Sequence, residues 1–112
     1  MDESTISEAW NNVKEKFQLE LEPHFQIEEK FIAPQLARKG ITKQLVRFYE
    51  EHNKLRRLVK LDVGDFGENL TKFGELLIAH IRFEEEELFE LTQELLDNIE
   101  LASIEEASEK MQ

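Results

Sequence analysis

The stretch LDVGDFGEN, residues 61 to 69, interrupts an otherwise helical pattern near the middle of the chain. It contains two glycines and two aspartates, residue types that favour turns because glycine tolerates positive φ and aspartate bonds to nearby backbone. Asp65, followed three residues later by Glu68, is typical of a cap that begins a helix. The stretch therefore predicts a turn that folds one helix back against the next.

On both sides of this turn, one set of residues recurs at intervals of three and four, the spacing of a single helical face. Downstream, the face consists of Leu70, Phe73, Leu77, His80, Glu84, Leu88, Leu91 and Leu95. Upstream, it consists of Leu45, Phe48, His52, Leu55 and Val59. The spacing predicts helices over about 65–97 and 42–61.

A third face precedes these two and predicts a helix over about 4–38. Its members are Trp10, Val13, Phe17, Leu21, His24, Glu28 and Phe31. Pro23 and Pro34 lie inside this span and predict a kink or a fresh start, because proline removes a backbone donor and clashes with the preceding turn. Gly40 follows two cations and predicts the end of the helix. A short helix over about 103–110 is expected near the C-terminus.

Length and composition fit this pattern. With 112 residues, 40% hydrophobic and 35% charged, and with four glycines and two prolines, residues 1–112 are expected to form one globular domain rather than a disordered chain. The fold class that follows is all-α, an antiparallel bundle of three long helices plus the short C-terminal helix.

The charge excludes several function classes. A net charge of −11 argues against nucleic-acid binding and against an anionic membrane surface, because both depend on Lys and Arg. The chain has no cysteine, so disulfide and thiol chemistry are excluded. The N-terminal MDESTISEAW has neither the basic nor the apolar part of a signal peptide, and no run approaches a membrane span. A cytoplasmic location is expected.

The three histidines are evenly spaced. His24 and His52 are 28 residues apart, and so are His52 and His80. Residues equidistant from a hairpin turn lie at the same height, because both helices rise about 1.5 Å per residue. The midpoints fall in or beside the predicted turns. The three imidazoles are therefore expected in one layer of the bundle.

Two carboxylates share this region. Glu28 and Glu84 each follow a histidine by four residues, which places each pair on one helical face. A single histidine on an apolar face is more often a core residue than a ligand. A buried glutamate is different, because it is rarely fully buried unless it is paired or bound to a metal. The combination predicts a metal site formed by His24, Glu28, His52, His80 and Glu84.

Ligand type restricts the metal. Imidazoles and carboxylates on facing helices suit non-haem iron or manganese, with carboxylates able to bridge two ions, and zinc is also chemically possible. In the acid run EEEE (84–87), only Glu84 is expected to point inward, whereas Glu85, Glu86 and Glu87 are expected at the surface. Arg56 is expected in a surface ion pair.

At these residues the sequence resembles the hemerythrin-like family, also called HHE cation-binding domains. The matching strings are EPHFQIEEKFIAP (22–34), EEHNKLRRL (50–58) and HIRFEEEELFEL (80–91). The resemblance implies a helical bundle with a non-haem di-iron centre, used for oxygen binding, for sensing, or for handling peroxide or nitric oxide. It also implies that Glu28 and Glu84 are the bridging carboxylates.

One departure from the family pattern concerns the N-terminus. Family members normally begin with an additional helix that carries its own histidine, and nothing before Trp10 supplies it. Five protein ligands are few for two ions, so the chain is expected to bind one ion, two incompletely coordinated ions or none, or to borrow a helix from another copy. A homodimer that buries the groove of the missing helix is expected, and the C-terminal helix is the competing occupant.

Three functions remain open from the sequence. The preferred one is a di-iron protein that binds or senses O2 or a similar small ligand. The second is a di-metal enzyme acting on peroxide or nitric oxide, and the sequence does not decide whether the chain is an enzyme. The third is a metal-free helical interaction module.

Overall fold

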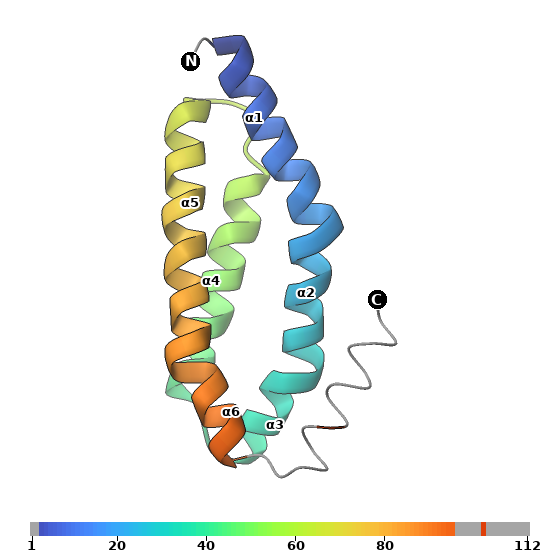
Figure 1. Cartoon of the computed structure of the whole chain (residues 1–112), viewed down its shortest axis with the longest axis vertical. Coiled ribbons are helices and arrows are strands. Elements are labelled where there is room, and N and C mark those ends of the chain that lie inside the picture. The colour runs from blue at the N-terminus through green and yellow to red at the C-terminus, as the bar shows by residue number, and fades with distance from the viewer. Residues whose placement is uncertain (1–2, 96–101, 103–112) are drawn as a thin grey trace.

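The computed structural model describes residues 3–95 and residue 102, and every regular element within these residues is a helix (Figure 1). The chain folds into three antiparallel columns. The first contains α1 (Glu3–Lys16), η1 (Phe17–Leu21), α2 (Glu22–Ile27), η2 (Glu28–Ile32) and α3 (Ala33–Arg38). The second is α4 (Lys43–Val59). The third contains α5 (Phe66–Phe83), η3 (Glu84–Leu88) and α6 (Phe89–Leu95). The all-α prediction is confirmed, and the helix expected over 103–110 lies outside the described residues.

The first column bends without breaking at its prolines. A π-helical turn, η1 or η2, ends directly before α2 and α3, which carry Pro23 and Pro34 in their first turns. In these turns the backbone N–H of Glu22 reaches the carbonyl of Phe17, five residues back, and that of Ala33 reaches Glu28 in the same way. The wider turn accommodates the proline ring, which would clash with the carbonyl four residues earlier in an α-helix. The column is therefore one continuous helix over 3–38.

The first hairpin turn depends on Gly40. This glycine has φ +84°, a left-handed conformation that residues with a Cβ rarely adopt. Its N–H donates to the carbonyl of Ala37 at 3.0 Å, and the N–H of Ile41 donates to the carbonyl of Leu36 at 3.1 Å. This pair of bonds is the Schellman arrangement, which satisfies the last carbonyls of a helix. The chain then reverses into α4.

The second turn follows the sequence prediction. Gly64 has φ +99°, and the Oδ1 atom of Asp65 accepts a hydrogen bond from the backbone N–H of Glu68 at 3.1 Å. Asp65 is thus the N-cap of α5. The first column also holds this turn, because the indole N–H of Trp10 donates to the carbonyl of Leu61 at 2.9 Å and Lys14 pairs with Asp62.

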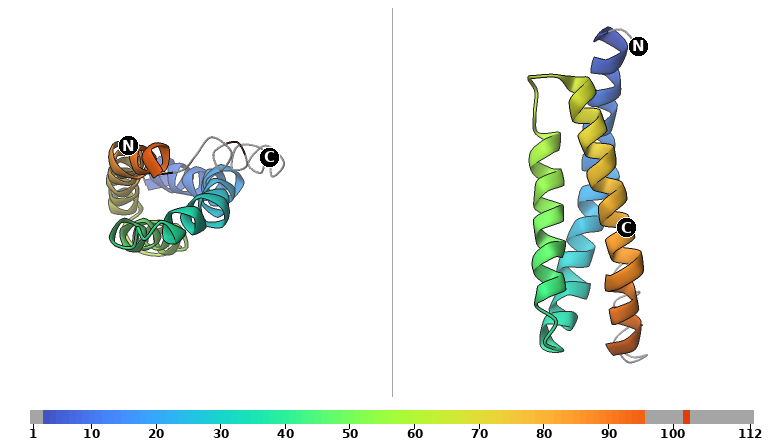
Figure 2. Two further views of the ribbon diagram at one scale, coloured as in Figure 1. Left: turned by 90° about the horizontal axis from the view of Figure 1, so that it is seen from below. Right: turned by 90° about the vertical axis from the view of Figure 1, so that its left-hand side faces the viewer.

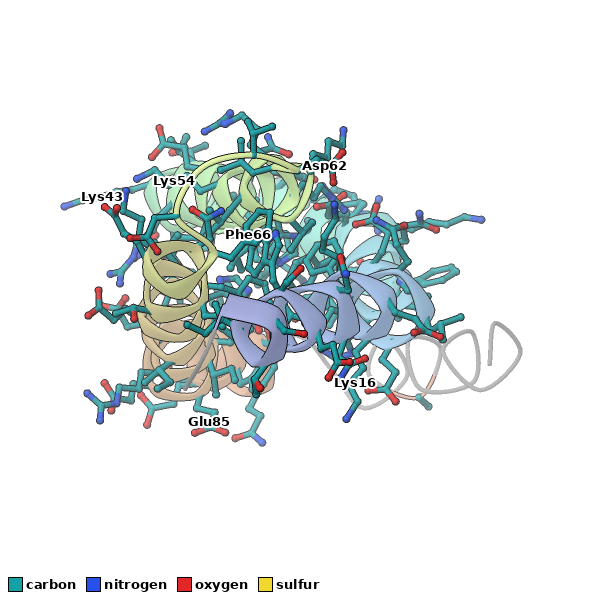
Figure 3. All side chains as sticks on the ribbon, turned by 90° about the horizontal axis from the view of Figure 1, so that it is seen from above. Lys16, Lys43, Lys54, Asp62, Phe66 and Glu85 are labelled. Carbon is teal, nitrogen blue, oxygen red and sulfur yellow. The ribbon has the colours of Figure 1, made fainter. Side chains whose placement is uncertain are left out.

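Two apolar clusters fill the interior. The cluster nearer the N-terminus consists of Trp10, Phe17, Phe25, Leu55, Val59 and Phe73. The cluster toward the first turn consists of Ala33, Leu36, Leu45, Phe48, Phe83 and Leu88. Seen from below, the three columns surround this common interior (Figure 2). Charged side chains such as Lys43, Lys54 and Glu85 point away from it (Figure 3).

None of the helices in the described part of the chain is long and apolar enough to cross a membrane.

Candidate metal centre

Four polar side chains meet in the interior, close to residues of both apolar clusters. They are Glu28, His52, His80 and Glu84, all buried, and one ligand atom of each lies within 4.8 Å of the others. They come from all three columns, as the equal heights of the hairpin partners predict. Glu28 and Glu84 are each the first residue of a π-helical turn. Such turns are frequent at functional sites.

The two buried imidazoles face each other. The Nε2 atoms of His52 and His80 lie 3.0 Å apart, and both side chains are almost completely excluded from solvent. The ring planes are inclined by 67°. If both nitrogens present lone pairs, they repel each other at this distance, and a metal ion bound between them would remove the repulsion.

The contact between His52 and Glu29 shows which ring nitrogen of His52 carries the proton. Its Nδ1 lies 2.6 Å from Oε2 of Glu29, and an ionised carboxylate only accepts hydrogen bonds. Nδ1 is therefore the donor, and in a neutral ring Nε2 presents its lone pair to the interior. Arg56 holds Glu29 in turn, with Nη1 at 2.9 Å from Oε2 and Nη2 at 3.2 Å from Oε1. Arg56 also donates from Nε to Glu22 at 2.8 Å.

His80 has a parallel arrangement. Its Nδ1 donates to Oε1 of Glu51 at 2.8 Å, and the other oxygen of Glu51 accepts from Nε of Arg47 at 2.8 Å. Arg47 also lies 3.4 Å from Oε2 of Glu87 and covers the ring of Phe83, with its guanidinium 4.3 Å from the ring centroid. Both histidines thus donate outward to a carboxylate that an arginine holds.

Burial lowers the pKa of His80 below its ordinary value of 6.5, and the neighbouring His52 acts in the same direction, whereas the hydrogen bond to Glu51 opposes them. The neutral ring is therefore favoured. A neutral imidazole with its lone pair directed inward is the form that binds a metal ion.

Buried oxygens of the two carboxylates lack hydrogen-bond partners in the part of the chain that the structure describes, and a bound cation would take the place of those partners. Both oxygens of Glu28 and the Oε2 atom of Glu84 are buried without a hydrogen-bond partner among the described residues. Burying a carboxylate in this state is costly, and the cost is avoided when a metal ion coordinates it. With mixed nitrogen and oxygen donors and no thiolate, the residues present fit iron or manganese, and also zinc.

His24, the fifth predicted ligand, lies at the rim of this cluster. Its side chain is 54% exposed, and its Nε2 is 3.5 Å from Oε1 of Glu28. The same oxygen is 3.5 Å from Nε2 of His52. The structure therefore brings four of the five predicted residues into the interior and leaves His24 at the surface. His24 belongs to the predicted apolar face of the first helix, yet more than half of its side chain is exposed, so this position of the face is not part of the buried interior.

Aromatic rings enclose the buried imidazoles. Phe25 stacks on His52 with ring centroids 3.9 Å apart and an interplanar angle of 10°. Phe48, completely buried, lies 4.2 Å from His52 and 6.3 Å from His80 between ring centroids. A completely buried Phe48 excludes water from this side of the two imidazoles. These rings surround the donors with an environment of low polarity, which strengthens their interaction with a cation.

Comparison with protein families identifies the chain. A model described as the hemerythrin HHE cation binding domain matches residues 4–92. The chain belongs to this family. Separate comparisons with curated proteins and with solved structures gave no significant match. The family's cation binding agrees with the buried cluster, and this HHE domain carries candidate ligands from every column of its bundle.

Sequence reasoning missed the outer partners of the histidines. Arg56 was expected at the surface, yet it holds Glu29 beside His52, and Glu51 contacts His80 from the neighbouring column. Glu29, Glu51 and Arg56 all occur in the strings that resemble the family, so a signal for them was present. Arg47 lies outside those strings. Glu85, Glu86 and Glu87 are exposed, as expected.

Proposed function

We propose that this HHE domain is a non-haem iron protein of the di-iron type that binds or senses O2 or a related small oxidant. The observation that carries the proposal is the convergence of His52 and His80 on one point. Beside it, both oxygens of Glu28 and the Oε2 atom of Glu84 lack a hydrogen-bond partner within the described part of the chain. This donor set would hold iron. When bound in its reduced state, iron supplies the electron density that O2 requires.

The position of Glu28 supports two ions rather than one. Its Oε1 lies 3.5 Å from the rim imidazole of His24 and 3.5 Å from the buried imidazole of His52. A carboxylate with imidazoles of two different helices beside it would help to hold two cations, one with each imidazole. The rim position would be the more accessible, because His24 is exposed while the other four donors are buried.

The surroundings favour binding over turnover. General acid–base catalysis needs a group that is free to exchange a proton near the reacting atoms. The carboxylates of Glu29 and Glu51 lie close to the centre, but each accepts hydrogen bonds from an imidazole and from an arginine. Phe25 and Phe48 exclude water from the buried side. The chain's own residues therefore hold and shield a small ligand rather than deliver protons to it.

Optical spectroscopy tests the proposal. The chain is loaded with Fe²⁺ without oxygen, and spectra are recorded before O2, after O2 and after O2 is removed. We expect a reversible absorption change that is lost in His80→Ala. Steady-state consumption of hydrogen peroxide or nitric oxide by the loaded chain would favour the enzyme instead. Absence of iron binding would favour the metal-free module.

We also propose that the chain forms a homodimer. Ile78, Ile81 and Phe89 are exposed along the third column, and exposed apolar side chains at this spacing on one helical face favour association. Sedimentation analysis of the wild-type chain and of Ile81→Lys tests this. A dimer that Ile81→Lys weakens supports the proposal, and a wild-type monomer at all concentrations contradicts it.

A further inference from the structure

We propose that Glu29 and Glu51 are positioning residues that aim His52 and His80 at the same point, and that Glu29, through Arg56, is the stronger of the two. The inference rests on the proposed metal site and deepens it, because it states what holds the two imidazoles in place. Neither glutamate points a free oxygen at the cluster formed by Glu28, His52, His80 and Glu84.

An imidazole ring on its own does not choose which nitrogen it presents. Turning the ring by half a revolution exchanges its two edges, and the two neutral tautomers are close in energy. A carboxylate beside Nδ1 favours the tautomer with the proton on that nitrogen, because it accepts a hydrogen bond there and donates none. In His80, Oε1 of Glu84 lies beside Nε2, but at 3.1 Å it is the longer contact. Glu29 does this for His52 at 2.6 Å, and Glu51 does it for His80 at 2.8 Å. Both Nε2 atoms are then left facing inward, 3.0 Å apart.

Each contact also joins two columns of the bundle. Glu29 lies in η2 and His52 in α4, whereas Glu51 lies in α4 and His80 in α5. The hydrogen bonds therefore fix the height of one column against the next at the level of the metal site. A metal-ligating histidine held in this way is oriented before the ion arrives, which reduces the ordering that binding requires.

The two glutamates are not equally well held. Both oxygens of Glu29 face the guanidinium fork of Arg56, and each of these side chains is only 21% exposed. Glu51 receives a single hydrogen bond from Arg47, whose side chain is 51% exposed. Solvent weakens an exposed ion pair, and a two-point contact has the better-defined geometry. Disturbing Glu29 or Arg56 should thus cost more than disturbing Glu51 or Arg47.

Zinc affinity measures the effect without redox chemistry. Zn²⁺ binding is determined by competition with a chelating dye for the wild-type chain, Glu29→Gln and Glu51→Gln. Glu50→Gln is the matched control, because Glu50 is an exposed residue of α4 and loses the same charge. We expect Glu29→Gln to weaken Zn²⁺ binding by about 10–100-fold, the effect usual for such outer partners. Glu51→Gln should weaken it less, and Glu50→Gln should leave it near the wild-type value.

Nuclear magnetic resonance reads the orientation directly, with no metal present. Long-range correlation of ring protons with ¹⁵N shows which nitrogen of each histidine carries the proton. We expect Nδ1 in both buried rings of the wild-type chain. Glu29→Gln should change the pattern of His52 and leave that of His80, and Glu51→Gln should do the reverse. Far-UV circular dichroism shows whether each variant folds. If Glu29→Gln does not fold, Arg56→Gln, which keeps Glu29 but removes the guanidinium that holds it, takes its place in both measurements.

The outcomes separate this inference from the proposed function. A wild-type chain that binds no Zn²⁺ or Fe²⁺ contradicts the metal site, while the ring pattern still tests the positioning role. A wild-type chain that binds Zn²⁺, with Glu29→Gln matching Glu50→Gln in affinity and wild type in ring pattern, overturns the positioning role alone. A larger loss in Glu51→Gln than in Glu29→Gln overturns the ranking.

Discussion

The Nε2 atoms of His52 and His80 lie 3.0 Å apart although 28 residues separate them in the chain. The residues between them form the end of α4, one turn and most of α5. The short distance therefore shows that the hairpin places the two histidines at the same height. The Nδ1 atom of each ring already donates a hydrogen bond to a carboxylate, so both Nε2 atoms are available to a cation. The space between them is where a cation would bind.

Metal binding should raise stability only while this contact exists. Adding Fe²⁺ at about 100 times its dissociation constant should raise the free energy of unfolding by about 2.7 kcal/mol, because a ligand that binds only the folded chain stabilises it by mass action. His52→Ala should abolish the rise, measured by anaerobic urea unfolding with and without Fe²⁺. The control is Lys54→Ala, on the outer face of the same helix, which should keep the wild-type rise. An equal rise in His52→Ala contradicts the site.

Glu28→Gln should stabilise the metal-free chain while it weakens metal binding. Both oxygens of Glu28 are buried without hydrogen-bond partners among the described residues. Replacing the carboxylate by a neutral amide should therefore raise the free energy of unfolding by about 1 kcal/mol or more, because an unpaired buried charge costs more than an unpaired amide. The variant loses a carboxylate ligand, so adding Fe²⁺ should raise its free energy of unfolding by less than it does in the wild-type chain. Urea unfolding in chelator and in Fe²⁺ measures both effects. Glu85→Gln, exposed in the same acid run, should change stability by less than about 0.5 kcal/mol, and a destabilised metal-free Glu28→Gln would contradict the account.

Two glycine substitutions should change the free energy of unfolding in opposite directions. Gly40→Ala should lower the free energy of unfolding by about 1 kcal/mol or more, because φ +84° is unfavourable for alanine. Gly74→Ala lies within α5, where an added Cβ meets no atom within 4 Å, and should raise it by about 0.5–1 kcal/mol. Urea unfolding of the two variants beside wild type tests both. The turn would be misassigned if Gly40→Ala were neutral.

Acid should destabilise the metal-free chain through His80. Burial lowers the pKa of His80 in the folded chain below 6.5, so in the pH range under that value the unfolded chain binds the proton more readily. Stability is therefore full above about pH 6.5 and falls as the pH drops toward the folded-state pKa. Urea unfolding in chelator at about pH 7.5 and about pH 5.5 measures the loss. Other groups also titrate, so the His80→Asn variant is compared, and it should lose less stability than wild type. An equal loss in both chains refutes the assignment to His80.

The three columns were predictable because their signals are local. Apolar residues at intervals of three and four, Gly40 after two cations, and Asp65 before Glu68 each act within a few residues. The observed helix limits lie within two residues of the expected ones in the described region. Equal spacing of the histidines then carried the pairing of His52 with His80, because helical rise is constant.

The remainder depends on contacts that no local pattern encodes. The π-helical turn at Glu84–Leu88 is not followed by a proline that would indicate it in the sequence, unlike the two π-helical turns of the first column. His24 shares the spacing of His52 and His80, yet it is exposed, because burial depends on whether another segment covers that side. Glu51 lies beside the apolar face of α4 rather than in it, and only the position of the neighbouring column shows that His80 reaches it.

The most direct test of the metal site is the iron content per chain, measured by elemental analysis on protein expressed with ample iron, beside the His80→Ala variant prepared in the same way. The account predicts stoichiometric iron, two ions per wild-type chain, and a content near zero in His80→Ala. Iron absent from the wild-type chain, or equal in the two proteins, would contradict it.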